Sequence, residues 1–258
     1  MPGAPAGSRR AAATLASRSL KPALAIVAAA GLALAVATAL APRPGGHGAA
    51  VPAGSAAAAP GGAAGLIRCG AGEIEFPAAV ASFRFNHDLF MPGYHAVVWR
   101  GGRAAGMSLL RTEVTDVEVL NALEQLGARP GNALGMDTWN RRHDPRNPAP
   151  DQVIAGPPVE VLVRLPGAAP VPLAEVLSDP GGRGIEMRLG GHRANIPLWH
   201  SGCIVCLYSC PGSKVGNARY TVRDYARGTT RFRARGERLP PDGTAVGVIL
   251  RLAALHPA

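Results

Sequence analysis

The chain has 258 residues, of which 47% are hydrophobic, 17% charged and 5% aromatic, and it contains 33 glycines and 24 prolines. This composition excludes a wholly disordered chain and a multi-span membrane protein. The formal net charge is +10, although all 17 acidic residues follow residue 65. Because the basic residues are dispersed along the chain instead of clustered, we expect no binding to nucleic acid.

The first 65 residues have the pattern of a membrane-targeting segment followed by a linker. Residues 22–41 form an uncharged run that is long enough to cross a bilayer as a helix. Basic residues remain on the cytoplasmic side, so the sequence predicts a cytoplasmic N-terminus over 1–21 and one transmembrane helix over 22–41. The rest of the chain is then periplasmic or external, and signal cleavage, giving a secreted protein, is the alternative. Residues 42–65, rich in Ala, Gly and Pro, are predicted to be a linker.

Residues 66–258 are predicted to form one exported domain. Thr115 and Glu118 have the spacing of a capping box, and apolar residues then recur at helical intervals as far as Leu126. This pattern predicts one well-specified helix over 115–126. The predicted class is α+β, with mostly antiparallel strands. Short apolar runs between turn residues predict strands over 73–80, 94–99, 107–114, 159–165, 220–225, 229–234 and 244–252.

Three stretches carry a resemblance to a known family. They begin at Gly70 with EIEFPA from residue 73, and continue with GMSLL at 106–110 and NALEQLGARPG at 121–131. In these stretches the chain resembles the YdjY-like family, most closely over residues 70–165. The resemblance implies an exported or membrane-attached domain, for which some members carry a ferredoxin-type label, with no settled activity. His95 stands in the segment where the family's acidic residue is expected, so no role of that acid is carried over.

Three of the four cysteines lie close together near the C-terminus. The run C-x2-C-x3-C-P, formed by Cys203, Cys206, Cys210 and the following proline, matches the last three cysteines of the bacterial ferredoxin motif. His200 occupies the position of the missing first cysteine. The sequence therefore predicts an iron–sulfur cluster, of the 4Fe–4S type, with these four residues as ligands. Cys69 is the other candidate for the fourth ligand.

Other chemistry fits the same residues. Zinc accepts three cysteines and one histidine in closed tetrahedral sites. Disulfides are common in exported proteins with an even number of cysteines, and Cys203 with Cys206 has the spacing of a redox-active dithiol.

The predicted function is that of a membrane-tethered, externally facing iron–sulfur protein. It would transfer electrons or assist a redox reaction, as a carrier or accessory domain rather than a catalyst, together with a redox or envelope protein partner. The alternative is a non-enzymatic binding or structural domain of the cell envelope, whose cysteines form a zinc site or disulfides.

Overall fold

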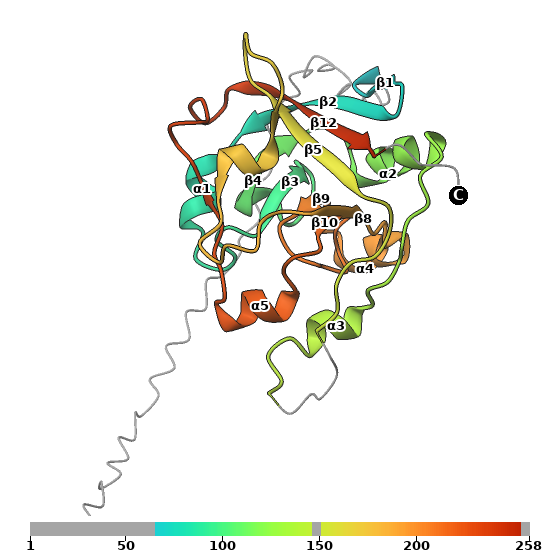
Figure 1. The fold of residues 1–258 in the computed structure, drawn as a ribbon, viewed down its shortest axis with the longest axis vertical. Coiled ribbons are helices and arrows are strands. Elements are labelled where there is room, and N and C mark those ends of the chain that lie inside the picture. Colours follow the sequence, from blue (N-terminus) through green and yellow to red (C-terminus); the bar gives the residue numbers. More distant parts are fainter. Residues whose placement is uncertain (1–64, 146–150, 254–258) are drawn as a thin grey trace, which may run out of the picture. The chain divides into compact units, whose positions relative to one another are not determined.

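The computed structural model describes residues 65–145 and 151–253, which form a ten-stranded sheet and a second sheet of two strands (Figure 1). The strand order of the large sheet is β6-β5-β12-β2-β4-β3-β9-β10-β8, and β1 pairs with β2. Its strands are β1 (Arg68–Gly70), β2 (Glu73–Val80), β3 (His95–Trp99), β4 (Ser108–Thr112), β5 (Val159–Arg164), β6 (Val171–Pro172), β8 (Met187–Leu189), β9 (Cys203–Cys206), β10 (Val215–Asn217) and β12 (Ala245–Leu252). The small sheet pairs β7 (Leu177–Ser178) with β11 (Arg233–Ala234).

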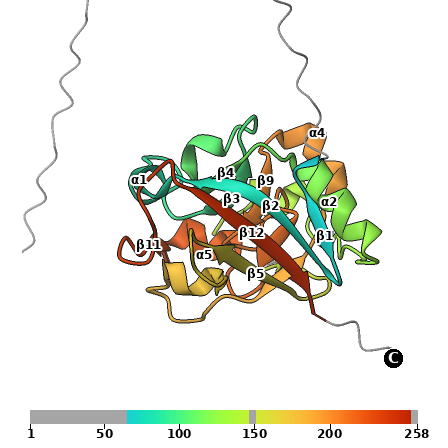
Figure 2. The ribbon, with the colours of Figure 1, turned by 90° about the horizontal axis from the view of Figure 1, so that it is seen from above.

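One half of the large sheet follows the simple alternation expected of an antiparallel sheet. In β2, every second side chain is buried, starting at Ile74 and ending at Val80. β12 lies between β2 and β5 and runs antiparallel to both, as Figure 2 shows. The other half contains β9, whose four residues are all buried. The three clustered cysteines therefore begin in an inner strand of the sheet.

The predicted fold class is wrong about the sheet. The sheet is mixed, because β3 pairs in parallel with β4, and β9 in parallel with β10. Turn residues such as Gly101 mark where a strand ends, but they do not determine whether the chain returns as a hairpin or crosses over to run in the same direction. The one well-specified helix that the sequence predicts, over 115–126, is present, together with several other short helices in the described part.

The helices surround the sheet and are short. The predicted helix at 115–126 is confirmed as α2 (Asp116–Gln125), with Thr115 as its N-cap. The predicted strand at 220–225 is instead α5 (Val222–Arg227), which starts with a second capping box from Thr221 to Asp224. The others are α1 (Ser82–His87), α3 (Met136–Asn140), α4 (Ile196–Trp199) and the 3₁₀ helices η2 (Ala105–Met107), η3 (Leu173–Val176) and η4 (Arg193–Asn195).

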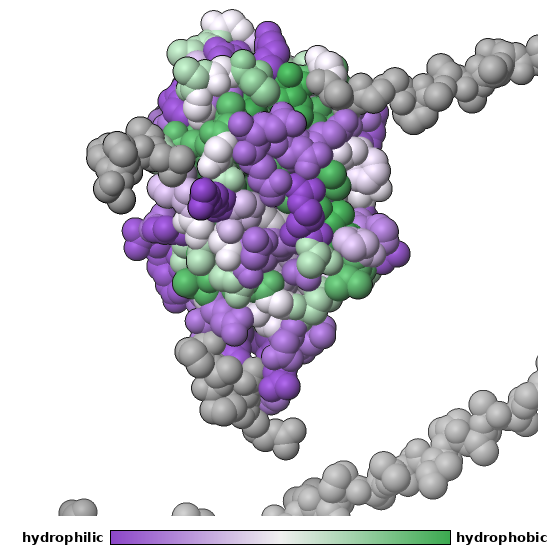
Figure 3. All heavy atoms as spheres, turned by 90° about the vertical axis from the view of Figure 1, so that its right-hand side faces the viewer, coloured by the Kyte–Doolittle hydropathy of each residue, from purple (hydrophilic) through white to green (hydrophobic). Residues whose placement is uncertain are grey.

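None of the helices within residues 65–145 and 151–253 is long and apolar enough to cross a membrane. The transmembrane helix predicted over 22–41 lies outside the described residues, together with nearly all of the predicted linker. The face of the domain at the right of Figure 1, near α2, carries hydrophilic and apolar side chains interspersed with one another (Figure 3).

The capping box of α2 should contribute measurably to stability. The Glu118 backbone N–H donates to Thr115 Oγ1 at 3.1 Å, and the Thr115 backbone N–H donates to Glu118 Oε2 at 2.8 Å. We expect Thr115→Ala to lower the free energy of unfolding by about 1 kcal/mol. Urea denaturation of the full-length protein measures this change. Thr244→Ala, which removes a hydroxyl that caps none of the described helices, is the control, and an equal loss in both variants would contradict the role of the cap.

Candidate metal centre

A bulge in β9 brings two cysteines to the same side of the sheet. In a regular strand, residues three positions apart point to opposite faces, so Cys203 and Cys206 would diverge. The pairing of β9 with β3 contains two register shifts, which leave Ala96 unpaired in β3 and Ile204 unpaired in β9. An extra residue in a strand changes which face of the sheet the following side chains point to. Cys203 and Cys206 can therefore both lie beside His95. His95, on β3, lies directly opposite Cys206 in the register.

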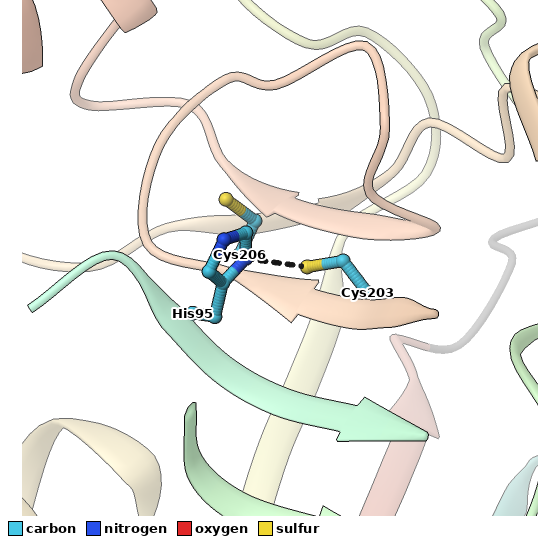
Figure 4. A group of neighbouring side chains, drawn as sticks. All are labelled: His95, Cys203 and Cys206. Carbon is cyan, nitrogen blue, oxygen red and sulfur yellow. Dashed lines mark hydrogen bonds between the residues drawn. The ribbon is translucent and has the colours of Figure 1, made fainter. Parts of the chain in front are cut away.

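These three side chains form a compact buried group (Figure 4). The Nδ1 atom of His95 lies 3.2 Å from the Sγ atom of Cys203. One ligand atom from each of His95, Cys203 and Cys206 lies within 4.8 Å of the other two. The cysteines are 1% and 0% exposed, and His95 is 5% exposed. Buried nitrogen and sulfur donors at this spacing are the arrangement that a soft or borderline metal ion requires.

The surroundings of Cys203 favour its thiolate form. Burial by itself raises the pKa of the Cys203 thiol, but hydrogen bonding with Cys206 and the positive charge of His95 outweigh it and lower the pKa to about 5. Burial by itself lowers the pKa of the His95 imidazole. The negative charge of the Cys203 sulfur and its hydrogen bond outweigh this effect, so the pKa is raised overall. Burial keeps the pKa of Cys206 well above its usual value, and the neighbouring thiols add to this effect. These pKa shifts therefore favour a negative Cys203 beside a positive His95 and a neutral Cys206 thiol.

The third cysteine of the run extends the group. Cys210 is 1% exposed, and its sulfur accepts the backbone N–H of Gly212 at 3.4 Å. Burial raises the pKa of Cys210, but the neighbouring Cys206 and Tyr94 side chains and this backbone N–H lower it overall. The thiol of Cys210 thus lies beside that of Cys206.

The hydroxyl of Tyr94 faces this third thiol without a formed hydrogen bond. Tyr94 is completely buried, and within the described part its hydroxyl is the one buried side-chain polar atom without a hydrogen-bond partner. Burial raises the pKa of Tyr94 far above its usual value, and the negative charge of Cys210 adds to this effect, so the hydroxyl keeps its proton. A buried donor without an acceptor is costly. A Cys210 thiolate bound to a metal would supply the acceptor that the hydroxyl lacks.

A buried cation lies close to the thiols. Lys214 is 1% exposed, and its Nζ atom donates to the Gly212 carbonyl at 2.9 Å and lies 3.3 Å from a carboxylate oxygen of Asp116. Asp116 is the first residue of α2 and is itself buried. The positive charge of Lys214 also lowers the pKa of Cys203. This ion pair thus joins α2 to the chain that follows Cys210.

The structure brings together only some of the residues predicted as ligands. Cys203 and Cys206 belong to the group, and Cys210 adjoins it. His200 is exposed at the C-terminal end of α4, in the left-handed region with a φ of 48°. Cys69 is exposed in β1, and all four cysteines are free thiols. His95 takes the position beside the thiols, and the signal for it in the sequence was a histidine in an otherwise apolar predicted strand.

The comparisons with known proteins agree on one family. A family model described as the YdjY domain matches residues 69–251. The "Uncharacterized protein YdjY" of Escherichia coli (strain K12) is 30% identical over 161 residues, which are 62% of this chain and 67% of that protein. No solved structure gave a significant match.

Proposed function

Since this chain belongs to the YdjY domain family, we propose that it is an exported metal-binding protein, in which Cys203, Cys206 and His95 hold one thiophilic metal ion. The observation that carries the proposal is the mutual distance of at most 4.8 Å among three buried donor atoms from two neighbouring strands. The apolar residues around the group would keep water and competing ligands away from the ion.

The spacing favours a single ion, with zinc as the expected metal. Zn–S bonds of about 2.3 Å and Zn–N bonds of about 2.0 Å place tetrahedral ligand atoms about 3.5–3.8 Å apart. The donor atoms of the group need only small side-chain rotations to reach that geometry. Cys210 is the fourth ligand in this proposal and completes a Cys₃His site. Three thiolates and Zn²⁺ leave one negative charge, and the buried ion pair of Lys214 with Asp116 places a positive charge near it.

An iron–sulfur cluster that transfers electrons is the second candidate, and the third buried thiol favours it. Cys203, Cys206 and Cys210 keep the order of a ferredoxin run, and apolar residues are interleaved among them. A cluster separates its ligand sulfurs more widely than a single ion does, since its own iron and sulfide atoms lie between them. The first candidate therefore requires less rearrangement of the buried side chains.

Metal analysis of the full-length protein tests both candidates. After anaerobic purification, we expect stoichiometric zinc, no visible absorption and no acid-labile sulfide. Cys203→Ser should lose most of the zinc, whereas the matched variant Cys69→Ser, which changes an exposed thiol in β1, should retain it. Iron with acid-labile sulfide and a visible absorption band would replace the first candidate by the second. Neither metal at stoichiometric content would overturn the proposal.

A further inference from the structure

The loop between α1 and β3 presents two large apolar side chains to solvent. Leu89 is 92% exposed and Phe90 is 83% exposed. The carboxylate of Asp88 accepts the backbone N–H groups of Phe90 and Met91, both at 2.8 Å. The loop is thus held in a defined turn with both side chains pointing away from the core. Adjacent, solvent-exposed apolar side chains fixed in this way are typical of a surface that binds a partner or a membrane.

Two arginines lie across a hollow from this loop. The hollow has a volume of about 370 Å³, and both the loop and the two arginines line it. The guanidinium of Arg142 lies 3.7 Å from the ring centre of Trp139, and that of Arg231 lies 3.9 Å from the ring centre of Tyr225. Each donates to backbone carbonyls, and neither forms an ion pair with another described residue. Their stacking on aromatic rings fixes the direction of the remaining N–H donors.

We propose that this face docks on a membrane surface that contains anionic phospholipid. Leu89 and Phe90 enter the boundary between the headgroups and the acyl chains, and headgroup phosphates lie in the hollow between Arg142 and Arg231. The planar guanidinium matches the geometry of a phosphate group and binds it through two parallel N–H donors. The proposal does not depend on the metal centre.

The shape of the surface favours a membrane over a protein partner. The apolar side chains protrude from the surface, whereas a protein hot spot more often fills a pocket of its partner within a large, closely fitting interface. Basic residues next to a protruding apolar tip provide the two contributions that hold a domain at an anionic bilayer, namely burial of apolar surface and attraction to the headgroups.

A spin label at the tip of the loop tests this docking in the full-length protein. In a Cys69→Ser background the other native cysteines are buried, so Phe90→Cys can be labelled selectively with a nitroxide. With vesicles of phosphatidylcholine and phosphatidylglycerol, we expect the label to become accessible to oxygen and protected from a water-soluble nickel chelate. A label at Gln125→Cys, exposed on α2 at the opposite end of the sheet from α1 (Figures 1 and 2), should remain in water.

The two arginines are tested against a matched change of charge. Arg142→Gln with Arg231→Gln should lower the ratio of inserted to water-exposed label about thirtyfold, since each basic residue near an anionic surface contributes about 1 kcal/mol. Arg100→Gln with Arg251→Gln removes the same charge from exposed ion pairs elsewhere and should change the ratio much less. A Phe90 label that stays accessible to the nickel chelate would overturn the docking. Equal insertion into vesicles of phosphatidylcholine alone, which has headgroup phosphates but no net charge, would overturn the requirement for anionic lipid.

Discussion

Replacing His95 by alanine should weaken zinc binding by roughly a hundredfold to a thousandfold, because the binding free energy of about 10–16 kcal/mol for a structural zinc site is shared among four ligands. The imidazole lies 3.2 Å from the Cys203 sulfur and is buried with it, so His95→Ala removes the one nitrogen ligand of the proposed site. Competition with a chelator of known affinity measures the loss in the full-length protein. The absorption of the cobalt-substituted protein reports the number of thiolate ligands.

His200→Ala is the informative comparison, because the sequence motif predicts His200 as the ligand whereas the structure places it exposed at the end of α4. We expect its zinc affinity to equal that of the parent protein. His95→Cys should restore most of the affinity that His95→Ala loses, since a thiolate is also a zinc ligand, and this restoration would exclude simple unfolding as the cause. A large loss of zinc affinity in His200→Ala, with normal affinity in His95→Ala, would contradict this assignment. It would place the metal site at the C-terminal end of α4.

The sequence predicted the elements of the domain better than their arrangement. Apolar alternation located β2, β5 and β12, and the Thr115–Glu118 pair located the start of α2. These patterns depend on neighbouring residues. Whether β3 meets β4 in parallel or antiparallel depends on how the intervening chain crosses over, which the local pattern does not encode.

The same distinction applies to the candidate site. Cys203 and Cys206 could be found because their spacing is local, but His95 lies 108 residues before Cys203. Only the pairing of β3 with β9 brings them together, and the irregular register of that pairing, with Ala96 and Ile204 unpaired, accompanies the approach of both cysteines to His95. His200 had the right spacing along the chain. Its exposed position after α4 shows that spacing in sequence does not ensure proximity in space.

Lys214→Met should lower the free energy of unfolding by about 3–5 kcal/mol, the usual result of removing one partner from a buried ion pair. The side chains of Lys214 and Asp116 are 1% and 6% exposed and lie 3.3 Å apart, so the carboxylate would remain buried without its counter-charge. Urea denaturation in the presence of a chelator measures the effect free of any contribution from metal binding. Arg100→Ala, which breaks an exposed ion pair with Glu113, should cost less than about 1 kcal/mol.

A second variant separates the charge from the packing. Lys214→Met combined with Asp116→Leu removes both charges and keeps most of the buried volume, so it should recover most of the stability that the single variant loses. If the double variant is as unstable as Lys214→Met, the loss comes from the packing of the lysine stem or from its hydrogen bond to the Gly212 carbonyl. The charge also acts on the thiols: because Lys214 lowers the pKa of Cys203, both variants should bind zinc less tightly than the parent even where the fold is restored. If the double variant recovers stability but binds zinc less tightly, Lys214 has two separate effects, one on the stability of the fold and one on the thiol ligands.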